Sequence, residues 1–428
     1  MSPHWTDFFT LADANVRYVT LGSMLLAATS AVVGCFTLLR KRALVWDAVA
    51  HAVLPGICLA FLVSGTKNPL ILLPGAFLTG WLSLLVIDYV TARSRIKEDS
   101  AIALVLSVFF GIGILLLTSI QHSGAAGQSG LDKFLFGNAA SLLGEDLLVF
   151  GGVAVVLLFS IVLFYKEFTL LSFDPSFART MGLPVRRLEL LLTTLTVLAV
   201  VVGIQAVGVV LMSAMLITPA AAARFWTDKL FVMILLAAAF GAFSGAAGAF
   251  VSFTAPAMHT GPWIVLIVSG IAMASFAFAP GRGIVGRFLR QRQNRRQILE
   301  ENLLKALYHL GEGQQDFYTG RSLTQILERR DLPRSAMKRG LQRLHRQGLT
   351  TFAGGQWQLT PEGQQRGQRV VRLHRLWELY LSQYLHLAPD HVHEGAETME
   401  HILTPELEEK IAAQLNHPAV GPHDEKIP

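Results

Sequence analysis

Long apolar stretches, separated by short polar or basic segments, fill the first 280 of the 428 residues. Residues 190–223 contain no charged side chain at all. Since a helix needs about 20 predominantly apolar residues to cross a bilayer, this pattern predicts membrane-spanning helices. It indicates about nine spans, near residues 18–39, 44–64, 69–90, 100–120, 146–165, 188–204, 207–223, 230–253 and 261–280. Residues 190–223 could instead contain a re-entrant segment at GIQAVG, in place of two complete spans.

After residue 282 the pattern becomes that of a soluble region. ENLLKALYHL (301–310) has helical spacing, and residues 322–349 are typical of two helices separated by a turn at Asp331–Pro333. TTFAGGQWQLTPEGQQRG (350–367) predicts two strands joined by a Gly-Gly turn, followed by the start of a helix. A helix-turn-helix followed by a two-stranded wing is a winged helix, which commonly binds DNA.

Composition and charge agree with a membrane protein. Charged residues make up 15% of the chain, against about 25% in ordinary soluble domains. Lys and Arg lie in alternate loops, at 40–42, 93–97, 166–187, 224–229 and from 282 onward. Because positive loops stay on the cytoplasmic side, we expect a multi-pass protein of the bacterial plasma (inner) membrane, with its N-terminus outside and its tail in the cytoplasm. The N-terminus lacks the basic start of a secretory signal, so the first span is expected to be retained.

Two kinds of chemistry are not indicated. Cys35 and Cys58 both lie in apolar spans outside any CxxC spacing, which favours packing roles over a disulfide or a metal site. No segment matches the phosphate-binding pattern G-x-x-x-x-G-K-[ST]. If transport is driven by ATP, the hydrolysing subunit is therefore a separate polypeptide.

The stretch WDAVAHAVLPG (46–56) places a carboxylate and an imidazole in the second predicted span. Asp47 and His51 are four residues apart, so they share one face of a helix. They can bind one cation together, bond each other, or mark a hydrated helix end. Ionisable residues within spans usually face a protein interior or a water-filled path. Pro55-Gly56 is expected to break or kink this helix.

A second polar feature lies in the charge-free run. It consists of Gln205, near Gly208, and of Thr218-Pro219 in the next span. These residues either line a transport path, or they are a hydrogen-bonded amide in the protein core and a proline kink.

The segment SFDPSFARTMGLPVRR (172–187) lies in a basic loop. Asp174-Pro175 predicts a helix N-cap followed by proline at the first helical position, and Gly182 and Pro184 end the helix. Phe173, Phe177 and Met181 follow at i, i+4 and i+8, on one face. The segment is either a partner surface or a simple interfacial connector.

The soluble tail has a basic first half and an acidic second half. Residues 321–375 hold 12 Lys/Arg against 3 Asp/Glu, whereas residues 376–428 hold 2 against 10. The basic half indicates a polyanionic partner, although a winged helix used for protein contact is an alternative. The predicted DNA-contacting residues lie on the second helix: Arg334, Lys338, Arg339 and Arg343.

The acidic half concentrates potential metal ligands. His393, Glu397, Glu400 and His401 fall on one helical face, and His374 and Glu378 repeat the i, i+4 spacing. Imidazole with carboxylate suits a divalent first-row metal. The alternative is a solvated acidic face.

The membrane half resembles the permease subunits of the zinc/manganese/iron ABC importers. The matching stretches run in family order from about residue 10 to 285 and include RKRALVWDAVAHAVLPGICLAF, IKEDSAIALVLSVFFGIGILL, LDKFLFGN, SFDPSFARTMGLP and GIQAVGVVLMSAMLITPAAAA. The resemblance implies a homodimer around a central path, separate cytoplasmic ABC ATPase subunits and an extracytoplasmic metal-binding protein. It further implies that Asp47 and His51 coordinate the transported metal. The ATPase coupling helix would include Asp174, Pro175, Phe177, Ala178, Met181 and Gly182.

The tail, from about residue 298, resembles the iron/manganese-dependent repressors of the diphtheria toxin repressor type. RLHRLWELYLSQYL, DHVHEGAETMEHIL, TPELEEKI and HPAVGPHDEKIP match in order. The resemblance makes Glu397, Glu400 and His401 primary-site ligands and His374, Glu378 and His393 further ligands; Glu397 stands where iron-responsive members have Cys, which favours manganese. The departure is in the first helix, where Asn302 and Lys305 stand in place of family ligands. A lysine ammonium only donates hydrogen bonds, so metal-driven coupling to DNA reading is in question.

The expected fold is an all-α polytopic membrane domain (1–285), a basic linker (286–297), a winged-helix domain (298–367) and a small helical metal-binding and dimerisation domain (368–428). The expected function is ATP-driven import of a divalent metal, with Mn²⁺ favoured over Fe²⁺ or Zn²⁺, and with a metal-responsive tail. Two alternatives stay open: a membrane-tethered metal-dependent transcription regulator, and a tail that senses metal and inhibits transport without DNA.

Overall fold

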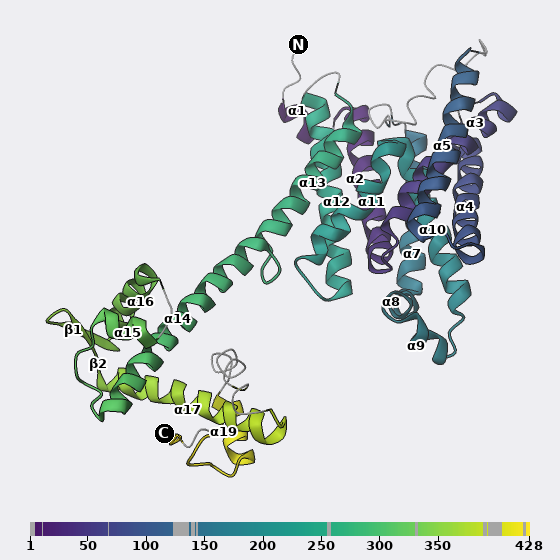
Figure 1. Cartoon of the computed structure of the whole chain (residues 1–428). Helices are drawn as coiled ribbons and strands as arrows, with labels where there is room; N and C mark the ends of the chain where they lie inside the picture. The colour runs from purple at the N-terminus through teal and green to yellow at the C-terminus, as the bar shows by residue number, and fades with distance from the viewer. Residues whose placement is uncertain are drawn as a thin grey trace. The chain divides into compact units, whose positions relative to one another are not determined.

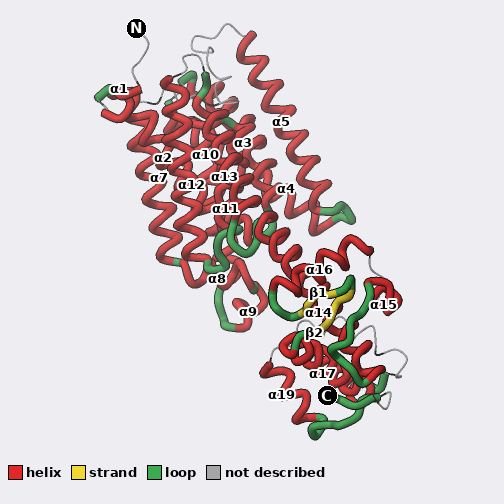
Figure 2. The backbone as a smooth tube through the Cα atoms, turned by 90° about the vertical axis from the view of Figure 1, so that its left-hand side faces the viewer, coloured by secondary structure: helices red, strands yellow, loops and turns green. Residues whose placement is uncertain are grey.

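A computed structural model describes residues 5–10, 12–66, 68–122, 137, 142, 144–254, 258–329, 333–387, 392, 405–422 and 425–428. The chain forms two compact units, Met1–Gly286 and Arg287–Pro428 (Figure 1). The described residues of the first unit form helices and the loops between them, and the two strands described belong to the second unit (Figure 2).

Eight helices among the described residues are long and apolar enough to cross a membrane. They are α2 (Ala14–Leu39), α3 (Ala43–Ser64), α4 (Pro69–Arg93), α5 (Glu98–His122), α7 (Gly144–Leu163), α10 (Val185–Val207), α12 (Leu230–Thr254) and α13 (Thr260–Phe278). A short helix, α1 (Trp5–Thr10), precedes them. These eight spans account for all but one of the nine that the sequence predicts.

The remaining predicted span, 207–223, is the shorter helix α11 (Val209–Arg224). Its 16 residues extend about 24 Å at 1.5 Å per residue, less than a bilayer core of about 30 Å. The break from α10 falls at Gly208, whose φ is 87°. Met212, Leu216 and Ala220 are fully buried, so α11 is an inner helix surrounded by the longer ones.

The helix that carries Asp47 is held by close backbone contact. A methyl group on Gly56 of α3 would lie 2.1 Å from the carbonyl oxygen of Gly75 in α4, so only glycine fits there. The sequence predicts that Pro55-Gly56 breaks or kinks this helix. Helix α3 continues through Pro55 to Ser64, so it is not broken there. Such small-residue contacts are a usual means of packing membrane helices.

The second unit begins within α14 (Ile284–Gln314). The predicted linker, 286–297, is thus part of a continuous helix rather than an irregular segment. After it come α15 (Leu323–Arg329), α16 (Arg334–Arg346), the antiparallel strands β1 (Thr350–Ala353) and β2 (Gln356–Leu359), α17 (Pro361–Tyr384) and α19 (Pro405–Gln414). Gly354 and Gly355 both have positive φ, as a two-residue hairpin turn of type I′ requires.

The second unit has two separate hydrophobic cores. One is formed by α14, α15, α16 and the hairpin around Leu303, Leu341 and Trp357. The other joins α17 to α19 around Leu376 and Ile411. The order of helices and strands over 301–367 agrees with the sequence prediction.

Candidate metal sites and partner surfaces

Asp47 and His51 lie on one face of α3, as their spacing predicts. The Nδ1 atom of His51 is 2.8 Å from the backbone carbonyl oxygen of Asp47 and 3.8 Å from its carboxylate Oδ1. Since a carbonyl oxygen only accepts, Nδ1 is the donor, and a neutral ring then carries its lone pair on Nε2. The contact thus selects the tautomer that leaves Nε2 available to a cation, while the Asp47 carboxylate lies 3.8 Å from Nδ1 of the same ring.

The surroundings of the pair are partly open. The His51 ring packs edge-on against Phe110 of α5, with ring centroids 5.1 Å apart. The side chain of His51 is 14% exposed and that of Asp47 38% exposed. In the described part of the chain, no group of three or more His, Cys, Asp or Glu side chains surrounds a metal-sized space. Two potential ligands, without a third among the described residues, would suit an ion in transit better than one held permanently.

The other polar features of the membrane unit contribute less. The side chain of Gln205 lies outside the described residues. Pro219 is contained within α11, which continues to Arg224. Cys35 and Cys58 are buried free thiols, which confirms the packing role that the sequence favours.

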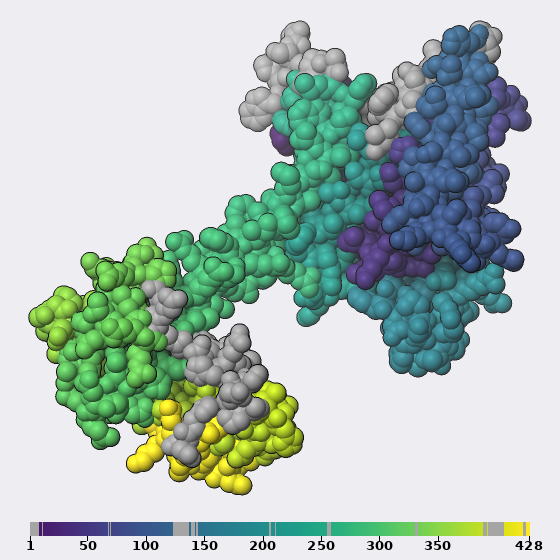
Figure 3. Space-filling view, in the orientation of Figure 1, coloured from purple at the N-terminus to yellow at the C-terminus, as the bar shows by residue number. Residues whose placement is uncertain are grey.

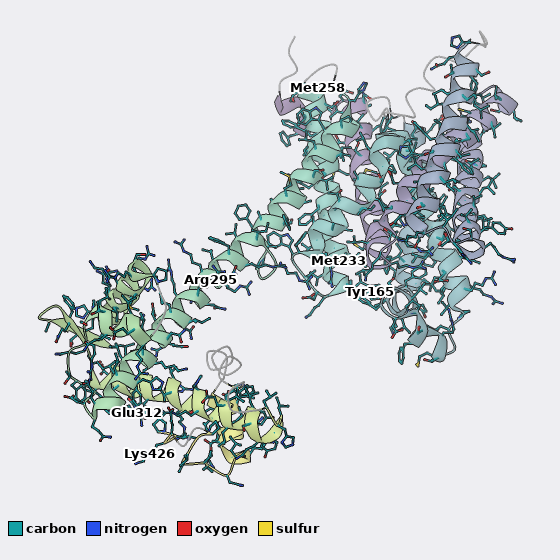
Figure 4. The ribbon with its side chains drawn as sticks, in the orientation of Figure 1. Tyr165, Met233, Met258, Arg295, Glu312 and Lys426 are labelled. Carbon is teal, nitrogen blue, oxygen red and sulfur yellow. The ribbon has the colours of Figure 1, made fainter. Side chains whose placement is uncertain are left out.

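The predicted partner helix forms as the sequence indicates. Helix α8 (Tyr165–Phe173) is followed by α9 (Pro175–Thr180), with Asp174 as N-cap: its Oδ1 accepts from the backbone N–H of Phe177 at 2.9 Å. Gly182 then ends the segment with a φ of 77°. In Figures 1 and 2, α8 and α9 lie at the end of the bundle opposite to α1; Figure 4 labels Tyr165, where α8 begins.

One side of this segment is buried and the other is unpartnered. Ala178 is fully buried, whereas Phe173, Phe177 and Met181 are between 51% and 65% exposed. Figure 3 shows the segment as a teal lobe at the lower end of the membrane unit. Three large apolar side chains on one exposed face are typical of a protein-docking surface.

The structure describes one pair of the metal ligands predicted for the tail. His374 and Glu378 lie on α17 with Nε2 and Oε1 2.9 Å apart, and each side chain is 5% exposed. The predicted ligands His393, Glu397, Glu400 and His401 lie outside the described residues. Lys305, which replaces a family ligand, is 3% exposed on α14.

Next to that pair, Arg375 joins three parts of the tail. Its guanidinium binds Glu312 of α14 at 2.8 and 2.9 Å and Glu425 near the end of the chain at 2.9 Å. Figure 4 labels Glu312 and also Lys426, whose backbone oxygen accepts from Arg375. The hydrogen bond from Arg375 holds the pKa of Glu312 below its usual range. Burial, reinforced by Arg375 and Lys305, lowers the pKa of His309.

Replacing Arg375 by methionine is expected to loosen α14 from α17 while leaving the membrane helices intact. The guanidinium is 3% exposed, and its loss removes several charge-assisted bonds, at a cost of about 2 kcal/mol. Hydrogen–deuterium exchange of α14 and α17 peptides in the full chain measures the effect. Arg369→Met is the control, because Arg369 lies on the same helix and pairs with Glu408 of α19, but its side chain is 49% exposed. Equal exchange in both variants would contradict the structural role of Arg375.

The predicted nucleic-acid residues lie on α16. Met337, Leu341 and Leu344 face the core, and Arg334, Lys338 and Arg339 are exposed on the opposite face. Arg343 differs, because its Nε donates to Glu300 at 2.6 Å. Sequence reasoning missed Arg346, which is exposed on the same face as Lys338; the helical spacing i, i+4, i+8 from Lys338 through Gln342 identifies this face.

Comparisons with known proteins agree with both halves. The sequence profile of the ABC 3 transport family matches residues 12–279, and that of the iron dependent repressor, metal binding and dimerisation domain matches residues 360–428. The manganese transport system membrane protein MntC of Bacillus subtilis is 44% identical over 88% of this chain and 86% of its own. The zinc transport system membrane protein TroC of Treponema pallidum is 45% identical over 66% of this chain and 95% of its own. The structure of PsaBC from Streptococcus pneumoniae aligns with a TM-score of 0.60 and 32% identity, over 67% of this chain and 99% of that one.

Proposed function

This chain belongs to the ABC 3 transport family, as the membrane permease of a manganese or zinc importer with a metal-binding tail, and we propose that it carries Mn²⁺ past Asp47 and His51. It is the membrane subunit of the transporter and not its ATPase. ATP is hydrolysed by partner subunits, and an extracytoplasmic protein delivers the metal.

The observation that carries the proposal is the geometry of the pair on α3. A carboxylate and an imidazole with a free Nε2, on one face of a helix, offer one hard and one borderline ligand, a combination that binds Mn²⁺, Fe²⁺ and Zn²⁺ alike. Manganese is favoured over iron and zinc because a manganese transport protein is 44% identical over 88% of the chain. Two copies of the chain, arranged about a central path, double the ligand set to two carboxylates and two imidazoles.

The positive charges support one orientation. Arg40, Lys41 and Arg42 lie between α2 and α3, and the docking segment 172–187 and the start of α14 are also basic. These segments face the cytoplasm in the proposed topology. The N-terminus is then outside, in the inner membrane of a bacterium, and α9 is the coupling helix that contacts the ATPase.

The experiment is metal uptake by proteoliposomes that contain the full chain, its ATPase and ATP, supplied with the extracytoplasmic metal-binding protein. We expect Mn²⁺ to accumulate, and Zn²⁺ or Fe²⁺ to accumulate less at equal free concentration. If Zn²⁺ is preferred, the choice of metal is wrong while the transport function stands. If no divalent metal accumulates, the transport function is wrong.

For the tail we propose a metal-responsive winged helix that binds DNA. The α15–α16 pair and the β1–β2 hairpin have that order of elements, and the exposed face of α16 is basic. The matched repressor domain covers only 360–428, so this assignment depends on the helices and hairpin themselves. A tail that senses metal and inhibits transport without DNA is the competing proposal, supported by the buried Lys305 at a ligand position.

Replacing Lys338 and Arg339 together by glutamine is expected to weaken DNA binding by the detergent-solubilised full chain by about tenfold at physiological salt, since each phosphate contact contributes to affinity. The measurement is fluorescence anisotropy of labelled duplex with and without Mn²⁺. Arg366→Gln with Lys410→Gln removes the same charge from exposed positions away from α16 and should leave affinity unchanged. Absence of DNA binding by the wild type at any salt would favour the inhibitory sensor.

A further inference from the structure

The turn between α2 and α3 ties the docking segment to the metal pair. Helix α2 ends at Leu39 and α3 begins at Ala43, so only three residues separate them. Asp47 is in the second turn of α3, directly after this connection. Because the connection is so short, any displacement of the end of α2 also displaces the start of α3 and the Asp47 carboxylate.

The end of α2 contacts the elements on either side of the docking segment, one contact on each side. Phe36 of α2 and Phe168 of α8 are fully buried, with ring centroids 5.9 Å apart. One turn further along, the Nη2 atom of Arg40 is 3.0 Å from Oε1 of Glu189 in α10. Helix α10 follows α9 after only four residues, 181–184. The contacts therefore join α2 to the elements on both sides of α9.

The ion pair lies in a loosely packed region. A cavity of about 920 Å³ opens beside it, lined by Arg40 and Glu189 together with Leu84, Tyr89 and Thr193. The Arg40 side chain is nevertheless only 15% exposed, whereas that of Glu189 is 39% exposed. Because side chains do not fill the space between the ends of α4 and α10, the ion pair holds α10 to α2 there, and burial of the Arg40 side makes it stronger than a fully exposed pair.

Arg42, in the same turn, makes weaker ionic contacts with α4 and α5. Its guanidinium lies 3.6 Å from Asp88 of α4 and 3.6 Å from Glu98 of α5, with all three side chains at least 40% exposed. Exposed pairs at this distance contribute little. Arg40–Glu189 is thus the shorter and better shielded of the ionic contacts at this turn.

We propose that Arg40 and Glu189 are positioning residues for transport, which transmit displacement of α9 to Asp47 and His51. The proposal rests on the transport function proposed above and adds the route of coupling. When the ATPase moves α9, α10 moves with it, Glu189 pulls on Arg40, and the α2–α3 turn shifts the metal pair. Without the ion pair, α9 moves and ATP is hydrolysed, but the metal pair does not follow.

The test is the number of Mn²⁺ ions moved per ATP hydrolysed by proteoliposomes of the full chain and its ATPase. Glu189→Gln is expected to lower this ratio about tenfold, a typical coupling free energy between sites, with metal-stimulated ATP hydrolysis retained. Glu98→Gln is the matched control: it makes the same substitution at the weaker contact with Arg42, where the atoms are 3.6 Å apart and the Glu98 side chain is 45% exposed. Its ratio should equal that of the wild type.

Charge reversal separates coupling from simple stability. Arg40→Glu alone should lower the ratio, and Arg40→Glu with Glu189→Arg should recover at least part of it. An unchanged ratio in Glu189→Gln overturns the proposal. So does a parallel fall of hydrolysis and uptake in the single variants, because that is the result of a destabilised fold. The wild-type ratio and the Asp47 variants test the transport function separately.

Discussion

Replacing Asp47 by alanine abolishes Mn²⁺ uptake, which we expect to fall at least about a hundredfold at limiting metal, the upper range for disruption of a metal site. The carboxylate is the anionic partner of the His51 ring on the same face of α3, and in a dimer two such groups are lost at once. His51→Ala should have a similar effect. The measurement is initial uptake in proteoliposomes with the ATPase present, alongside binding of the ATPase to show that the complex is assembled.

The chain offers a close control in His122. The Nδ1 atom of His122, at the end of α5, bonds the backbone oxygen of Thr118 at 2.8 Å, in the same i, i+4 arrangement that His51 makes with Asp47. A carboxylate is not found at position 118, so His122→Ala should leave uptake at the wild-type rate. Uptake that survives Asp47→Ala and falls in His122→Ala would mean that the metal passes elsewhere.

Replacing Phe177 by aspartate prevents the ATPase from docking. Phe177 is 51% exposed on α9, between two further exposed apolar residues, Phe173 and Met181. A charge placed in the centre of an apolar interface is expected to weaken association about thirtyfold or more, as for a binding hot spot. Co-purification of the tagged chain with its ATPase measures the loss, and metal-stimulated ATP hydrolysis should disappear with it.

The control variants for this surface separate docking from folding. Phe177→Ala removes the ring without adding charge and should give an intermediate loss. Phe159→Ala removes an equally exposed ring, 65% exposed, from the spanning helix α7 and should leave docking unchanged. Full ATPase binding by Phe177→Asp would exclude α9 as the contact.

Local chemistry explains what could be predicted from the sequence. The N-cap at Asp174 and the shared face of Asp47 and His51 depend on residues within four positions of each other, and the spans depend on charge-free length. The Arg40–Glu189 and Arg343–Glu300 pairs were not predicted, because their partners are 149 and 43 residues apart. Hydropathy alone also could not show that α11 is short and inner, since a buried helix and a lipid-facing helix are equally apolar.

The uninterrupted helix α14, which starts six residues after α13 ends, has a consequence for how the tails meet. In a permease dimer the two tails are tethered, so each meets its partner at an effective concentration set by the tether and not by how many chains the cell makes. A freely diffusing repressor loses its dimer when its expression falls. Here pairing of the tails becomes independent of protein abundance, which leaves metal as the variable that governs it.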